Sequence, residues 1–186
     1  MEPDFEFVRC HRLEQLQRRH QRLWLPQAQN KCIEEGTVQA LSAKWAKPWA
    51  ARPLIEEFRK AQDPKGTGLK RAIGNALSVV ADDSVIEQVA ELALDKRHGR
   101  AREMLALALG NMRTPQAVDV LIELLDDEEV AGHAVMGLGR LKAKRARPHI
   151  ERFLSHPKAW IRREAKRALA KIDKAEQARN PGKSSN

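Results

Sequence analysis

Glutamates at matching positions are the first residues in this sequence whose type and spacing could build a functional surface. Four of them follow similar apolar letters, so we expect them at equivalent places on successive helices, about 10 Å apart where helices stack side by side. Such a row would bind a basic peptide or protein surface, or it would only solvate the helices. With two neighbouring carboxylates, the acidic column comprises Glu56, Glu87, Glu91, Asp119, Glu123 and Glu151.

Lysine and arginine concentrate in the last third of the chain. Residues 133–186 hold 15 basic and 4 acidic side chains, whereas residues 67–132 hold 7 and 12, and the whole chain has a net charge of +9. Crowded like charges favour a nearby anion, either a phosphate backbone or an acidic protein, although a terminal repeat needs a polar outer face in any case. The predicted anion or nucleic-acid site comprises Arg140, Lys142, Lys144, Arg145, Arg147, Arg162, Arg163, Lys166, Arg167 and Lys171.

Other residue types with chemical potential do not form a recognisable site. Cys10, His11, His20 and Cys32 lack the paired short spacings of zinc fingers and ribbons. The sequence contains no G-x-S-x-G elbow, P-loop, H-E-x-x-H or paired C-x-x-C motif. We therefore expect no metal, no cofactor and no catalytic residues, and a binding protein rather than an enzyme.

Tryptophan and histidine are predicted to be structural. The four tryptophans are dispersed, and we expect them to pack between helices: Trp24, Trp45, Trp49 and Trp160. Four histidines fall at helix starts or turns, where we expect capping or surface roles: His98, His133, His149 and His156.

Repeated helices must position all these residues. The segment Leu109-Gly110-Asn111-Met112 recurs with its glycine equivalents at positions 74, 110, 139 and 170, at steps of 36, 29 and 31 residues. A period in this range indicates an array of helical hairpins that stack on their neighbours. Aromatic residues make up only 4% of the chain and period-two alternation is missing, which argues against a sheet.

Turn residues and helix caps set the expected helix boundaries. Thr114, and either Asp83 or Ser84, are placed to cap the helices that follow them. The expected pairs are 37–47 with 51–61, 68–80 with 84–95, 99–112 with 115–125 and 128–142 with 147–155, followed by a last helix at 158–173.

The repeated motif resembles the HEAT family, in particular the short bacterial type called PBS-lyase HEAT-like repeats. Residues 161–172, beginning Ile-Arg-Arg-Glu-Ala, are similar to the first helix of that type, and Leu121–Leu125 resembles its second helix. The resemblance implies an all-α fold: a right-handed α-solenoid, or armadillo-like superhelix, of about four helical hairpins plus a final helix. It also implies that the second helices line the concave face, which would place the acidic column there.

The two ends of the chain depart from the repeat. Residues 1–36 are expected to form an N-terminal helical cap, or a detachable partner-binding helix, because 6–24 is amphipathic. The solenoid is expected over 37–173, and a disordered tail over 174–186. With two cysteines, an acidic N-terminus and no run of about 18 apolar residues, we expect a cytoplasmic protein without a membrane segment.

Such repeats serve many roles, so the resemblance does not choose a function by itself. The leading hypothesis is an interaction scaffold that binds a protein partner through its curved face and its basic C-terminal end. One alternative is a nucleic-acid-binding module, for example one similar to alkylpurine glycosylases. Another is a bilin-lyase-like subunit. The partner, the pathway and the oligomeric state stay open.

Overall fold

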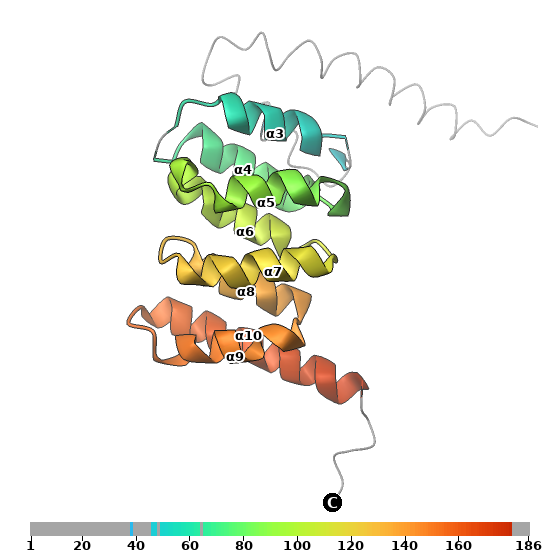
Figure 1. Ribbon diagram of the computed structural model, residues 1–186, viewed down its shortest axis with the longest axis vertical. Helices are drawn as coiled ribbons and strands as arrows, with labels where there is room; N and C mark the ends of the chain where they lie inside the picture. The colour runs from blue at the N-terminus through green and yellow to red at the C-terminus, as the bar shows by residue number, and fades with distance from the viewer. Residues whose placement is uncertain (1–37, 39–45, 48, 64, 180–186) are drawn as a thin grey trace, which may run out of the picture.

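The computed structural model describes residues 38, 46–47, 49–63 and 65–179, and the regular structure in these ranges is entirely helical. The helices alternate between two layers (Figure 1). One layer contains α3 (Ala51–Lys60), α5 (Ile86–Leu94), α7 (Pro115–Glu123) and α9 (Arg147–Glu151). The other contains α4 (Leu69–Val80), α6 (Arg102–Leu109), α8 (Ala131–Leu141) and α10 (Ala159–Arg179).

Contacts between consecutive helices build the array. Within the second layer α4 packs on α6, α6 on α8 and α8 on α10. Across the two layers α3 packs on α4, α5 on α6, α7 on α8 and α9 on α10. This arrangement confirms the predicted all-α solenoid. Short 3-10 segments extend or join the helices: Asp83–Val85, Lys96–Ala101, Leu124–Asp126, Lys144–Ala146 and Arg152–Ser155.

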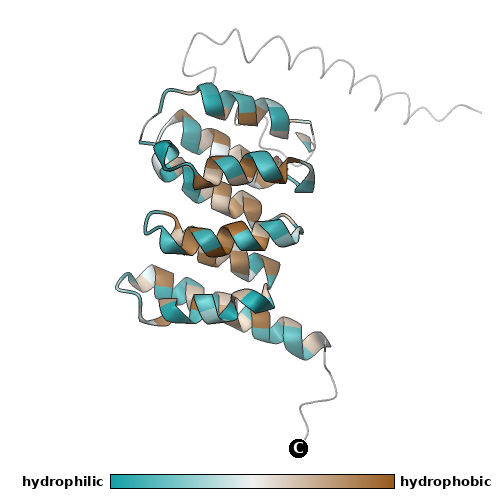
Figure 2. Ribbon diagram, viewed as in Figure 1, coloured by the Kyte–Doolittle hydropathy of each residue, from teal (hydrophilic) through white to brown (hydrophobic). Residues whose placement is uncertain are grey.

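The core between the layers is made mainly of alanine, leucine, valine and isoleucine, and the hydrophobic stretches of the helices are visible in Figure 2. Small residues let the helices of the second layer approach closely. A Cβ atom on Gly110 would lie 2.5 Å from the Cα of Gly137, and one on Gly139 would lie 2.7 Å from the Cβ of Ala168. Glycine at these positions therefore costs some helix propensity but allows direct backbone contact between repeats.

The observed helix ends agree with most of the expected ones. Thr114 caps α7 as predicted, because its side chain accepts a hydrogen bond from the Ala117 N–H. At the preceding turn the capping side chain is Asp82, which accepts from the Ser84 N–H, rather than Asp83 or Ser84.

The last helix is longer than expected. The predicted tail begins at residue 174, but α10 continues to Arg179. Residues 174–179 are strong helix formers, and Glu176 within them pairs with Lys144 at 3.1 Å. The first helix breaker after this point in the sequence is Pro181.

Several predictions concern residues outside the described ranges. The N-terminal cap at 1–36, the end of the predicted tail at 180–186, and Trp24 and Trp45 all lie there. The group of four metal-type side chains, Cys10, His11, His20 and Cys32, lies there as well.

Candidate functional site

All six carboxylates of the acidic column are exposed on one layer of the array. They come from the four helices α3, α5, α7 and α9. Arg59 of α3 shows directly that the first step of the column is close in space, since its guanidinium pairs with Glu56 at 3.0 Å and with Glu91 of α5 at 2.9 Å. Glu56 and Glu91, which occupy matched positions 35 residues apart in the sequence, thus share the guanidinium of Arg59.

Arginine neutralises much of this column. Asp119 pairs with Arg145 at 2.7 Å, and Glu151 pairs with Arg147 at 3.1 Å. Among the described residues, Glu87 and Glu123 have no such counterion. The carboxylates available to a partner without breaking an ion pair are therefore Glu87 of α5 and Glu123 of α7.

Most of the predicted anion site is used inside the protein. Arg145 and Arg147 pair with the acidic column, Lys144 with Glu176, and Arg167 with Glu164 at 2.6 Å. The guanidinium groups of two further members donate to backbone carbonyls: Arg140 to Leu107, and Arg162 to His156 and Pro157.

The side chains of four of the ten predicted residues have neither an ion pair nor a hydrogen bond among the described residues. Lys142 ends α8 in the left-handed conformation with φ of 52°. Arg163, Lys166 and Lys171 lie on α10, and all three side chains are exposed. Lys174, which lies just beyond the predicted site on the same helix, is exposed and unpaired too.

Buried ion pairs join successive repeats, and the sequence analysis did not identify them. Arg102, at the start of α6, is only 2% exposed. Its guanidinium donates to Asp127 at 2.7 Å, to Glu129 at 2.8 Å and to the Gly99 carbonyl at 3.1 Å. The sequence signal for this contact is the arginine near the start of the repeated motif, which is present as Arg102 and Arg162 but is replaced by Ala131 in the copy between them.

Glu103 forms a second buried cluster beside the first. This carboxylate is 3% exposed and accepts from Arg71 at 2.8 Å and from Arg100 at 3.0 Å. Burial opposes ionisation of Glu103, but the two arginines outweigh burial and hold its pKa below the usual value. His133 Nε2 lies 4.0 Å from the carboxylate, and burial lowers the pKa of this imidazole.

Lys70 and His98 form a third mostly buried cluster. The Lys70 ammonium lies 3.0 Å from His98 Nδ1 and 5.6 Å from the centre of the Phe58 ring. Because an ammonium only donates, Nδ1 of His98 must be unprotonated in this contact. Burial and the Lys70 charge lower the pKa of His98.

The predicted surface or capping role is correct for His149 and His156 and wrong for His98 and His133. His149 is exposed, and His156 Nδ1 accepts from the Lys158 N–H as a cap. His98 and His133 are mostly buried, because their rings pack against Phe58 and Trp160 at centroid distances of 5.0 and 5.6 Å.

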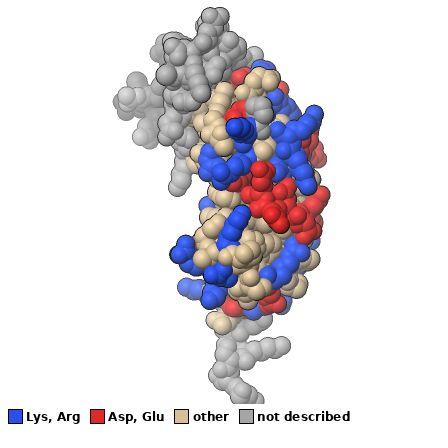
Figure 3. Space-filling model, turned by 90° about the vertical axis from the view of Figure 1, so that its left-hand side faces the viewer, with Lys and Arg blue, Asp and Glu red and all other residues tan. Residues whose placement is uncertain are grey.

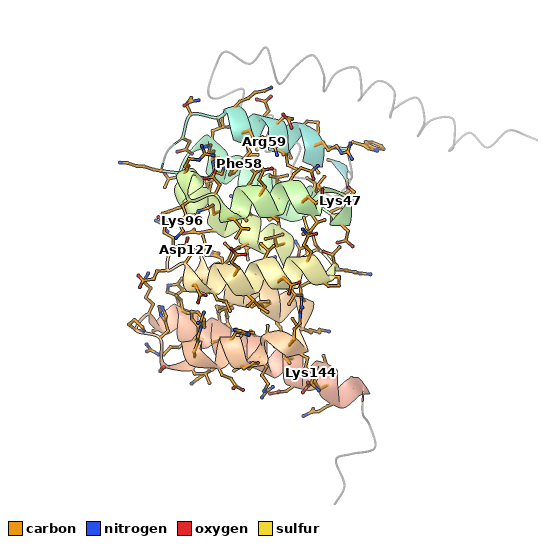
Figure 4. All side chains as sticks on the ribbon, viewed as in Figure 1. Lys47, Phe58, Arg59, Lys96, Asp127 and Lys144 are labelled. Atoms are coloured by element: carbon orange, nitrogen blue, oxygen red, sulfur yellow. The ribbon has the colours of Figure 1, made fainter. Side chains whose placement is uncertain are left out.

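The turn edge is the side of the molecule where each first-layer helix leads into the next second-layer helix. Positive and negative side chains alternate along this edge. Lys96 and Asp127 lie on it, at the opposite side from Lys144 (Figure 4). Viewed from this side, lysine and arginine lie above and below a central band of aspartate and glutamate (Figure 3). The 126–129 turn supplies four consecutive carboxylates to this side of the molecule.

The described part of the chain shows no group of His, Cys, Asp or Glu side chains arranged to hold a metal ion. In the same ranges no helix is both long and apolar enough to cross a bilayer. The arrangement is one of surfaces: an array with an acidic column, unpaired cations on its last helix, and buried charges that fix neighbouring repeats in register.

Comparison with known proteins agrees with this architecture. The family described as HEAT repeats matches residues 51–131 and 125–180, which together cover more than half of the chain. No curated protein matches the sequence. The two matched segments contain every helix from α3 to α10. The chain belongs to the HEAT-repeat family.

Proposed function

We propose that this protein is a non-enzymatic scaffold that binds a protein partner on the face of α5 and α7. HEAT repeats generally serve as scaffolds for protein interactions. The observation that carries the proposal is that Glu87 and Glu123 are exposed at neighbouring helices of one layer and have no counterion within the described ranges. A partner with lysine or arginine at matching spacing would supply the missing charges.

The ion pairs around these two glutamates support a defined binding surface. Arg59 and Arg145 hold the neighbouring carboxylates in place at 2.9 and 2.7 Å. A partner would therefore meet fixed rather than freely moving side chains next to Glu87 and Glu123, which lowers the entropic cost of binding. The proposed chemistry of the partner is a basic segment of protein.

Glu123→Lys provides the test, with Glu128→Lys as a matched control. Both glutamates are exposed and have no ion pair in the part of the chain that the structure describes, but Glu123 lies on α7 and Glu128 on the turn edge. Proteins retained by the immobilised wild type are identified by mass spectrometry, and the affinity of each purified candidate is then measured for all three proteins. We expect Glu123→Lys to weaken binding about tenfold or more, which corresponds to about 1.4 kcal/mol, and Glu128→Lys to leave it unchanged. Equal affinities for all three proteins, or no retained protein, would contradict the proposal.

A further inference from the structure

The outward face of α10 occupies a position that is used for stacking everywhere else in the second layer. In α6 the positions that face the next repeat are Glu103, Ala106 and Gly110, and all three are buried. Aligned on their glycines, the corresponding α8 residues are Gly132, Val135 and Gly139, which are buried too. Gly132 is covered by the ring of Trp160, and Gly139 by Ala168, both from α10.

In α10 the same three positions are Arg163, Lys166 and Ala170, and all three are exposed. No further helix follows α10 in the described chain. The surface that would carry another repeat is therefore open to solvent, and two of its three stacking positions bear a positive charge instead of a small or apolar side chain.

The positive charges form a stripe, called here the α10 stripe: Arg163, Lys166, Lys171 and Lys174. None of the four has an ion pair or hydrogen bond among the described residues. The three acidic residues of α10 are used elsewhere, since Glu164 pairs with Arg167, Asp173 with Arg147 and Glu176 with Lys144. A polar cap would need only mixed charges for solubility, whereas this stripe has one sign.

The composition of the stripe favours a polyanion over a protein surface. Protein interfaces bury aromatic or aliphatic anchors at their centre and are poor in lysine. The centre of this stripe offers only Ala170. The Trp160 ring lies at the start of α10, where it packs against Gly132 and His133 while the residue stays 37% exposed. Phosphate groups, in contrast, need only lysine and arginine for contact.

We propose that the α10 stripe binds the phosphodiester backbone of a nucleic acid without reading its sequence. Arg163 and Lys174 are eleven positions apart, so the stripe is about 16 Å long at a helical rise of 1.5 Å per residue. That length matches about five steps of a duplex at 3.4 Å per base pair. This binding is independent of the protein partner proposed for α5 and α7, because the two surfaces share no residue.

The test measures binding of the full chain to a fluorescent 15-base-pair DNA duplex, and to an RNA duplex of the same length, between 50 and 250 mM salt. If four phosphates are neutralised, the plot of log K against log salt concentration has a slope of about −3.6 for DNA. The double variant Lys166→Ala/Lys171→Ala should reduce that slope by about 1.8. The control Lys65→Ala/Lys96→Ala removes two exposed lysines elsewhere and should keep the wild-type slope. Scrambled duplexes should bind with equal affinity.

Each other result would overturn the proposal. If neither duplex binds at 50 mM salt, a nucleic acid is not the ligand of the stripe. An equal reduction of slope in the control shows that the phosphates contact the protein outside the stripe. Polyglutamate of the same length and charge is added as a competitor. If it displaces the labelled duplex as effectively as unlabelled duplex does, the stripe serves an acidic protein instead. All four substituted lysines are exposed, so we expect every variant to keep its helices. Circular dichroism of each variant checks this.

Discussion

Arg102 and Arg97 show how burial changes the consequence of losing an arginine. Arg102 is 2% exposed and pairs with Asp127 and Glu129 of the following turn, whereas the side chain of Arg97 is 88% exposed and pairs only with Asp95. Arg102→Ala leaves the mostly buried Asp127 without its counterion. We expect this variant to lose about 3 kcal/mol in the free energy of unfolding, measured by urea denaturation.

Arg97→Ala is the matched control, because it makes the same substitution in an exposed pair. Water replaces the lost contact there, and little stability should change. If both variants lose the same stability, the buried cluster of Arg102 does not hold the two repeats together.

Two mostly buried histidines make stability depend on pH. The pKa values of His98 and His133 are lowered below the ordinary 6.5, mainly by burial. As the pH falls below about 6.5, the unfolded chain takes up protons before the folded protein does, so folded stability decreases. The loss is at most about 1.4 kcal/mol per pH unit for each histidine until the folded pKa is reached.

The corresponding variant is His98→Gln/His133→Gln, compared with the wild type by urea denaturation at pH 7.5, 6.5 and 5.5. Its free energy of unfolding should decline less over this interval than that of the wild type. His149→Gln removes an exposed imidazole and should keep the wild-type decline. A double variant as steep as the wild type would show that other groups cause the decline.

Helix spacing in the second layer depends on glycine for steric reasons. Gly110 has an ordinary φ of −64°, so alanine fits its backbone, yet the added Cβ would lie 2.5 Å from the Gly137 Cα. We expect Gly110→Ala to destabilise the protein by about 1–3 kcal/mol, because α6 and α8 must move apart. Ala170, the equivalent in α10, is exposed, so Ala170→Leu should change thermal stability little.

The sequence was sufficient to predict the helices and most of their boundaries, because these depend on local chemistry. Thr114 and the repeated glycines act within one turn or one neighbouring helix, so their effect follows from spacing. The clusters around Arg102 and Glu103 were not predicted, since charged letters give no sign of burial until the facing turn is known. The same limit applies to the basic site: its composition was visible in the sequence, but the acidic partners of Lys144 and Arg145 were not.

The array as a whole has an interior that tolerates stacking and a C-terminal end that opposes it. The middle helices are the most hydrophobic, and α10 is mostly hydrophilic (Figure 2). Stacking of another molecule on α10 would bury Arg163 and Lys166 without counterions, at a cost that apolar contact with Ala170 cannot offset. We therefore expect the cationic stripe to have two effects: it should attract polyanions, and it should oppose stacking of another molecule on α10.

This exclusion can be removed by giving α10 side chains that suit the stacking face of α8. In Arg163→Ala/Lys166→Val, a small residue stands where α8 has Gly132, and valine stands where α8 has Val135. The change leaves apolar side chains at positions 163, 166 and 170, and an open array with such an end can associate through them. We expect a concentration-dependent rise in mass by light scattering after gel filtration, relative to the wild type. Lys171→Ala/Lys174→Ala removes the same charge but leaves Arg163 and Lys166 in place, so its mass should equal that of the wild type. If both variants associate equally, the lower net charge alone is responsible. Arg163 and Lys166 then have no special role in preventing stacking on α10.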